Sequence, residues 1–431
     1  IRKLLDEKNP MDIDRMLVVT FTEAAASEMK EKIVRALQNS GTERARMQLK
    51  LIGGADITTI DAFCLRCVWN NFHNIGIDPN FGICDKAEAE LLKEEACETL
   101  FNGLYASEDE EEKERFIRIT RMYSSNRNDY PLRELILCVY RFIQSFAEPE
   151  KWLDEKAAMY DTSDGKFFES VWVRDITETC KSTGEAYAKK YARLLEDMAA
   201  QYGINAPYDE LVKDFPICSG DGHSMFEVWG KLWNAVILAK TAAQRLYASC
   251  DGSKSRREMF DAAYIACGEC FTSSYFPTFK KTKAVSENES WDSFNSQYRA
   301  LTKEFKKAAQ LVPTDAECTE HQFAELSQTV NDIVWLVKKF TGIYMPMKEK
   351  KNAYEFSDVE HMTHTLFQIE DIQNVYRDKY DEILIDEYQD TNGLQDSIFR
   401  LISKNNIFMV GDLKQSIYRF RGGDPFIFKE K

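Results

Sequence analysis

The feature that most constrains the fold is a short apolar run that ends abruptly in carboxylates. Ile383–Ile385 is too short for a helix and suits a buried strand, and Asp386 and Glu387 follow it directly. After them comes a helix with apolar residues at helical spacing. Such a strand is typical of the ligand edge of a parallel sheet, so the sequence predicts an α/β fold with its chemistry at this edge.

The two carboxylates suit a site that hydrolyses a nucleotide. An aspartate at a strand end can hold Mg²⁺ through its water shell, and an adjacent glutamate can deprotonate the water that attacks a γ-phosphate. An Asp-Glu pair alone is often only a solvated loop. Here it follows a strand and continues as DEYQDTN, residues 386–392. We therefore expect Asp386 to bind the metal and Glu387 to activate water.

A second apolar run, Phe408–Val410, leads into Gly411 and a further polar segment. In that segment Gln415 can sense a terminal phosphate through a hydrogen bond. Rings and guanidinium groups then alternate along the chain: Tyr418, Arg419, Phe420 and Arg421. Core packing is the competing interpretation of the rings, but the alternation favours binding of single-stranded nucleic acid.

The segments DEYQDTN and GDLKQSIYRFRGGDP (411–425) resemble motifs II and III of superfamily 1A DNA helicases of the UvrD, Rep and RecB type. Within that group the chain is most similar to the A subunits of bacterial AddAB-type ATP-dependent helicase/nucleases. The resemblance implies a partial RecA-like parallel-sheet domain 1A, interrupted by a large, mostly helical domain 1B. It also implies ATP and Mg²⁺ as cofactors. The implied partners are single-stranded DNA, duplex DNA and a second, B-type subunit.

The N-terminal part carries two further segments of this kind. Met16–Phe21 reads as a buried strand, and Thr22 can cap the helix after it. TFTEAAASEM (20–29) resembles motif Ia, which implies DNA contacts by Thr20, Phe21 and Thr22. Glu23 stands where the family usually has Asn, and a carboxylate at a helix N-terminus is stabilising, so this change has a structural explanation.

A β-branched run, 57–60, is predicted to form another strand, and its sequence with the next residues resembles the family's TIHSFC segment. The resemblance implies that Thr59 lies near the DNA backbone. Asp61 replaces the usual His, so the phosphate contact of that His is lost.

Between about residues 85 and 376 strand-like runs give way to long amphipathic segments. These are Asp85–Phe101, Pro131–Phe146, Phe168–Tyr202, Phe226–Ala248 and Phe323–Phe340. We predict domain 1A in two parts, 1–84 and 377–431, with 85–376 as insertion 1B. The net charge of −15 argues against a surface coated for nucleic acid, so DNA contacts must come from local grooves. The most basic clusters are Lys254, Arg256 and Arg257, then Lys280, Lys281 and Lys283, which an ordinary solvated surface also explains.

No apolar run approaches the roughly 20 residues that span a bilayer, and the first residues lack the apolar core of a signal peptide, so we expect a cytoplasmic protein without membrane contact. The 11 cysteines then suggest buried thiols. Two CxxC pairs, Cys64/Cys67 and Cys267/Cys270, leave a zinc site open, although the first pair follows a helical, apolar pattern. His361 and His364 have no evident third ligand, so we treat them as structural.

A phosphate loop, GxxxxGK[ST], is needed to hold the nucleotide, and the sequence contains no such segment. In the family it precedes motif Ia, so we expect the chain to be an excised fragment or an incomplete gene product that cannot hydrolyse ATP alone. The implied function is part of the motor of a helicase in DNA double-strand end processing and recombinational repair, whose parent carries an exonuclease. The alternatives are a UvrD-like repair helicase without a nuclease and a motor-dead DNA-binding scaffold.

Overall fold

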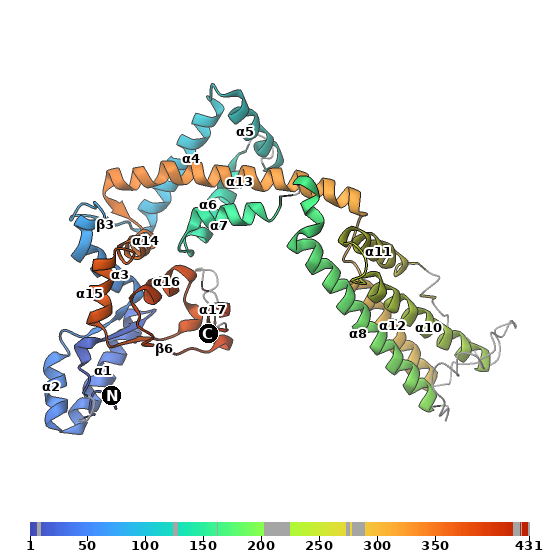
Figure 1. Ribbon diagram of the computed structural model, residues 1–431, viewed down its shortest axis with the longest axis horizontal. Coiled ribbons are helices and arrows are strands. Elements are labelled where there is room, and N and C mark those ends of the chain that lie inside the picture. The colour runs from blue at the N-terminus through green and yellow to red at the C-terminus, as the bar shows by residue number, and fades with distance from the viewer. Residues whose placement is uncertain are drawn as a thin grey trace. The chain divides into compact units, whose positions relative to one another are not determined.

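A computed structural model of the chain describes residues 1–6, 10–123, 128–161, 163–201, 225–272, 276–277, 289–416, 423 and 425–429. Contacts within the chain define two compact units (Figure 1). Residues 1–156 and 331–431 form one, here called the sheet unit, and residues 157–330 form the other, the helical unit. Residues 85–156 and 331–376 of the predicted insertion belong to the sheet unit, and residues 157–330 form the helical unit.

Four parallel strands make the main sheet, in the order β2-β1-β5-β6. Their bounds are β1 Met16–Thr20, β2 Asp56–Thr59, β5 Glu382–Ile385 and β6 Ile407–Met409. Each forms where an apolar or β-branched run occurs, as predicted, so the α/β class is confirmed. Because all four run the same way, their carboxyl ends share one edge of the sheet.

Side chains alternate between two apolar layers, as strand geometry requires. Leu17 and Val19 face a core formed with α3 Ile60–Asn71, α14 Phe356–Leu366, α15 Glu370–Lys379 and α16 Gly393–Ile402. Met16 faces a smaller core formed with α1 Glu23–Ser40 and α2 Glu43–Leu51. At the centre of the larger core Phe63 is fully buried, with four aromatic rings around it. Both faces of the sheet are thus covered, and the strand ends are left for chemistry.

The strand predicted over 57–60 ends one residue early for a local reason. The Thr59 hydroxyl accepts a hydrogen bond from the Ala62 amide at 3.2 Å and caps α3, so Ile60 is already helical. A short strand, β4 Ala353–Tyr354, lies within the region predicted to be free of strands. It pairs in parallel with β3 Gly82–Ile83, which lies just before the predicted insertion, and so joins two segments about 270 residues apart in the sequence.

The remaining helices of the sheet unit are α4 Lys86–Tyr105, α5 Glu110–Tyr123, α6 Tyr130–Ile143, α7 Pro149–Ala158 and α17 Pro425–Lys429, together with the C-terminal part of α13 Ala316–Lys351. Buried charges join α4 and α13 to α14. Lys348 is fully buried and contacts both carboxylate oxygens of Asp358 at 2.5 and 2.6 Å. Lys93 on α4 donates to Glu355 at 2.7 Å, just before α14.

The helical unit contains α8 Val171–Gln201, α10 Met225–Ser249, α11 Arg256–Glu269, α12 Glu289–Ala308 and the start of α13. In Figure 1 α8, α10 and α12 run side by side around an apolar core rich in aromatic rings. Gly184 allows α8 to approach α10, because a Cβ there would overlap the Tyr247 backbone and lie 2.7 Å from the Ala243 carbonyl. Among the described residues, no helix is long and apolar enough to cross a membrane.

Candidate functional site

Asp386 and Glu387 leave the carboxyl end of β5, as the sequence predicts. The Asp386 amide donates to the Val19 carbonyl at 3.0 Å, which extends the sheet by one residue beyond the strand. Asp386 is half-buried and its Oδ1 accepts from the Glu387 amide at 3.1 Å, whereas Glu387 is exposed. Glu387 has a φ of 50°, a left-handed conformation that is costly for a residue with a side chain. Such strain is common at functional sites, and here it turns two consecutive carboxylates out of the strand end.

Gln389 connects these carboxylates to the neighbouring strand. Its side chain is fully buried, its Nε2 donates to Glu387 Oε2 at 2.7 Å, and its Oε1 accepts from the Asp412 amide at 2.9 Å. Gly411 makes room for this contact, because a Cβ at that position would overlap Gln389 Oε1. One amide therefore links the segments that follow β5 and β6. In the sequence, only a glycine directly after an apolar run gives a signal for this arrangement.

Gln415 lies in the same loop, at the end of a 3-10 turn, Leu413–Gln415. Its exposed side chain donates to Asp412 Oδ2 at 3.1 Å. The structure thus brings Asp386, Glu387 and Gln415 to the carboxyl ends of two adjacent strands. The predicted DNA-contacting residues of this segment lie outside the described residues: Tyr418, Arg419, Phe420 and Arg421.

The strand-end carboxylates suit a hard cation such as Mg²⁺. Carboxylate oxygens are its preferred protein ligands, and it keeps several waters, which a half-buried Asp386 beside an exposed Glu387 allows. The turn behind them is firmly held, because the buried Tyr388 hydroxyl donates to Asp396 on α16. The donor set therefore fits a hydrated magnesium ion.

The threonines predicted to touch DNA are engaged with their own backbone. Thr20 is 1% exposed and its hydroxyl donates to the Thr22 carbonyl at 3.0 Å. Thr22 caps α1 by accepting from the Ala25 amide at 3.2 Å, as the sequence predicted. Thr59 caps α3 in the same way. These hydroxyls shape the loops at the carboxyl edge, and their contact with DNA stays a prediction.

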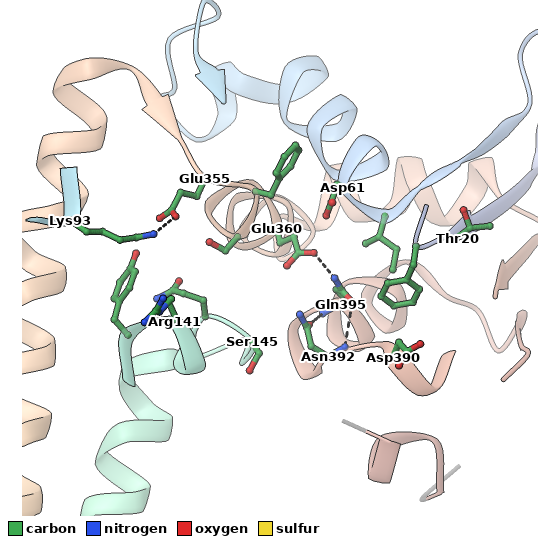
Figure 2. Close-up of a pocket in the computed structure, with 16 residues that line it drawn as sticks. Thr20, Asp61, Lys93, Arg141, Ser145, Glu355, Glu360, Asp390, Asn392 and Gln395 are labelled. Carbon is green, nitrogen blue, oxygen red and sulfur yellow. Dashed lines mark hydrogen bonds and ion pairs between the residues drawn. The ribbon is translucent and has the colours of Figure 1, made fainter. Parts of the chain in front are cut away.

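Phe21 is half-buried and lies on the wall of a pocket of about 250 Å³ beside this edge. Figure 2 shows side chains from β1, α3, α4, α6, α14 and α16 converging on it. Polar and charged groups dominate: Thr20, Asp61, Lys93, Arg141, Ser145, Glu355, Glu360, Asp390, Asn392 and Gln395. The pocket therefore offers both hydrogen-bond donors and acceptors next to an aromatic ring.

Glu360 is a buried acid in this pocket whose pKa is strongly raised. It is 5% exposed, and its Oε1 accepts from Gln395 Nε2 at 2.6 Å. Burial, reinforced by the Asp61 carboxylate, raises the pKa of Glu360 to about 8. Asp61, which stands where the family usually has His, therefore lies close enough to act on a second acid. Sequence reasoning missed Glu360 because neither its spacing nor its neighbours mark it as different from any other helical glutamate.

The cysteine pairs and the histidine pair that the sequence singled out lie among packing contacts. Cys64 and Cys67 are buried in the core of the sheet unit, and Cys267 and Cys270 in that of the helical unit. No group of three or more possible metal ligands occurs among the residues that the structure describes. His361 contacts the Gln144 carbonyl at 3.2 Å.

The first basic cluster also packs locally, since Arg256 pairs with Glu169 at 3.1 Å and Arg257 lies over the Phe168 ring. The second cluster, Lys280, Lys281 and Lys283, falls outside the described residues.

Comparison with known proteins extends these observations. A family model described as the UvrD/REP helicase N-terminal domain matches residues 1–431. The chain is 33% identical to the A subunit of an ATP-dependent helicase/nuclease from Ruminiclostridium cellulolyticum, over all of this chain and 33% of that protein. Identities to proteins of the same name from Anoxybacillus flavithermus and Clostridium novyi are 32% and 31%, again over the whole chain and over 34% and 33% of those proteins. The chain thus spans about a third of the length of the curated relatives it matches.

Proposed function

Because the chain belongs to the UvrD/REP helicase family, we propose that it forms part of the motor of an ATP-dependent DNA helicase, in the manner of the helicase/nuclease A subunits. We propose that this helicase acts in DNA double-strand end processing and recombinational repair. The observation that carries the proposal is the geometry at the strand ends, where Asp386 and Glu387 emerge from β5 and Gln389 connects them to the loop after β6. A motor needs such a connection, because hydrolysis of the nucleotide at the end of one strand must change the conformation of the loop after the next strand.

The roles of the residues follow from their positions. A bound ATP–Mg²⁺ complex supplies the γ-phosphate and the charge that stabilises its transfer. Asp386, fixed by the Glu387 amide, would hold the metal through its waters. Glu387, turned toward solvent, would orient and deprotonate the attacking water. Gln415, hydrogen-bonded to Asp412, would also hydrogen-bond the terminal phosphate. Loss of that phosphate would then change the conformation of the segment that follows Gln415.

The DNA-binding part of the proposal centres on rings beside the strand ends. Phe21 lies at the carboxyl end of β1 on the wall of the polar pocket, where its exposed face can stack on a base. Tyr418 and Phe420 would add rings, and Arg419 and Arg421 charge for the phosphates. Thr20, Thr22 and Thr59 would support the loops along which the DNA strand runs. The relatives are named as one subunit of an enzyme, which supports a second, B-type subunit in the same complex.

Single-stranded DNA binding tests this assignment on the chain as it is. We expect Phe21→Ala and Phe420→Ala each to weaken the affinity for an oligonucleotide by about 1–3 kcal/mol, the value of one stacked base. Phe271→Ala, which truncates an exposed ring of the helical unit, is the matched control and should leave affinity unchanged. Equal affinity of all four proteins would show that these rings do not contact DNA.

ATP turnover tests the catalytic half. The 431 residues contain no GxxxxGK[ST] loop, so we expect no magnesium-dependent ATP hydrolysis from this chain by itself. Turnover above background that Glu387→Gln abolishes would contradict the expected inactivity while supporting the role of Glu387. Turnover that Glu387→Gln leaves intact would contradict the proposed catalytic residue.

A further inference from the structure

Helices α4 and α6 border a groove of about 320 Å³ that the proposed helicase chemistry does not use. The Tyr105 hydroxyl at the end of α4 donates to Asp129, just before α6, at 2.9 Å and holds this end of the pair together. Each wall is a helical stripe of positions i, i+3 or i+4, and i+7. Leu91, Glu94 and Glu98 lie on α4, and Tyr130, Glu134 and Leu137 lie on α6.

The groove exposes apolar side chains on both walls. Leu91 is 67% exposed and Tyr130 is 61% exposed, while Cys97 and Leu137 close the floor. Large apolar groups on facing walls of one groove are unusual on a solvated surface, where single scattered ones are the norm. Because the end of α4 is bonded to the residue before α6, the two helices run antiparallel, so Leu91 and Tyr130 lie toward opposite ends of an apolar strip whose middle is formed by Cys97 and Leu137.

Around this strip the charge is almost entirely negative. Five carboxylates line the groove, Glu90, Glu94, Glu95, Glu98 and Glu134, against one guanidinium, that of Arg133. Arg133 is engaged with the Phe101 ring at 5.0 Å, and Glu90 with Lys93 at 3.3 Å. Within the part of the chain that the structure describes, Glu94, Glu95 and Glu98 form no ion pair. The three carboxylates are therefore available to cations from another molecule.

The charge and the apolar side chains of the groove indicate which kind of molecule can bind there. Phosphates would be repelled, so DNA does not fit the groove, and a second copy of this chain, with its net charge of −15, is a poor match. An apolar strip with acidic walls is complementary to a helix that carries apolar residues on one face and Lys or Arg beside them. We propose that the α4–α6 groove is a docking surface for a basic amphipathic helix of a partner protein.

A defined probe tests this docking surface. Two labelled peptides of about 18 residues, equal in Leu and Lys content, would be compared by fluorescence anisotropy; one has its Leu on a single helical face and the other has them scattered. We expect the peptide with its Leu on one face to bind more tightly. The double variants Glu94→Lys/Glu98→Lys and Leu91→Ala/Tyr130→Ala should each weaken the affinity for that peptide about tenfold or more. Glu111→Lys/Glu114→Lys on α5 makes the same charge change outside the groove and should have a much smaller effect.

Other outcomes would overturn the proposal. The first is equal affinity for the two peptides, and the second is a loss of affinity in the α5 variant as large as in the groove variants. The third is binding of a single-stranded oligonucleotide at the groove with an affinity like that of the peptide. The fourth is self-association of the chain, seen by sedimentation, that the groove variants abolish. Hydrogen exchange of the unmodified chain gives an independent reading if a variant fails to fold. Bound peptide should slow exchange in residues 86–105 and 130–143, and protection found only elsewhere would contradict the assigned surface.

Discussion

The sheet unit and the helical unit bury different kinds of side chain. In the sheet unit Lys93, Asp332, Lys348, Asp358, Glu360, Asp390 and Asp396 are all buried. In the described part of the helical unit the buried polar residues are neutral: Thr177, Ser249, Asn295, Thr319 and Thr329. Its ion pairs, such as Lys189–Glu185, lie on the surface. The described part of the helical unit therefore buries neutral groups only, whereas the sheet unit also buries charged ones.

This difference follows from what each unit has to position. Burying a charge costs several kcal/mol, and even a good partner often only offsets that cost. Glu360 lies in the pocket beside the strand ends, and Asp358, the partner of Lys348, lies on the same helix, α14, whereas Asp332 joins α13 to Arg115 and Arg118 of α5. With Lys93 and Glu355, these charges join α4, α5, α13 and α14 to one another. In its described part the helical unit consists of helices around an apolar core and has no sheet edge for buried charges to organise.

The sharpest way to break this comparison is to remove one buried charge. Lys348→Met leaves the Asp358 carboxylate buried without its cation and should cost about 3–5 kcal/mol of the sheet unit's stability. Hydrogen exchange, resolved by mass spectrometry, would show faster opening of β1 and β5 while α8 and α10 stay protected.

Two controls belong to this experiment. Lys348→Met/Asp358→Asn removes both charges and should recover much of the loss, because Asn can still accept the Glu355 amide that Asp358 now accepts. Lys189→Met breaks an exposed pair in the helical unit and should change little. A loss as large with Lys189→Met would mean that the two units do not differ in this respect.

The second test uses pH. Burial raises the pKa of Glu360 to about 8, above the value of about 4.5 in an unfolded chain, so the folded protein keeps a proton that the unfolded chain releases. Stability of the sheet unit should therefore fall as pH rises from about 4.5 to 8, by up to ~1.4 kcal/mol per pH unit for this one group.

Glu360→Gln should flatten that slope, because its amide oxygen can still accept from Gln395 Nε2 and carries no proton to lose. Unfolding free energies at pH 5, 6.5 and 8 would measure it. Glu178→Gln, an exposed carboxylate of α8, should keep the original profile. A slope that survives Glu360→Gln would place the titrating group elsewhere.

The parts predicted from the sequence are those with a local signal. Each strand of the main sheet contains an apolar or β-branched run, and the carboxylates at 386 and 387 follow one directly, so the fold class and the position of these carboxylates at a strand end were predicted correctly. The roles of these residues, and DNA contact by Tyr418 to Arg421, stay predictions.

The parts not predicted depend on contacts between distant segments. Lys93, Arg141 and Glu360 meet in one pocket although they belong to three separate helices, each with an ordinary amphipathic pattern. The boundary between the two compact units near residue 330 also has no sequence signal, because α13 continues through it without a break.

The third test concerns packing in the helical unit. Gly184→Ala places a methyl group against the α10 backbone at Tyr247 and Ala243, so the helices must move apart at a cost of about 1–3 kcal/mol. Gly230→Ala on α10 is the matched control: a Cβ there meets no atom within 4 Å, so it should be neutral or slightly stabilising. Faster exchange of α8 and α10 should accompany Gly184→Ala only. Equal effects of the two changes would rule out the close approach.

The smallest effect is expected in the sheet unit, at Gly411. Gly411→Ala would displace the Gln389 amide oxygen from the Asp412 amide, and losing one neutral hydrogen bond costs about 1 kcal/mol. Gln389→Leu removes the same connection from the other side, so the two changes made together should cost less than the sum of their separate effects. Thermal unfolding of the four proteins measures this coupling. Additive losses would show that Gly411 and Gln389 act independently, and that the link between the ends of β5 and β6 does not run through this amide.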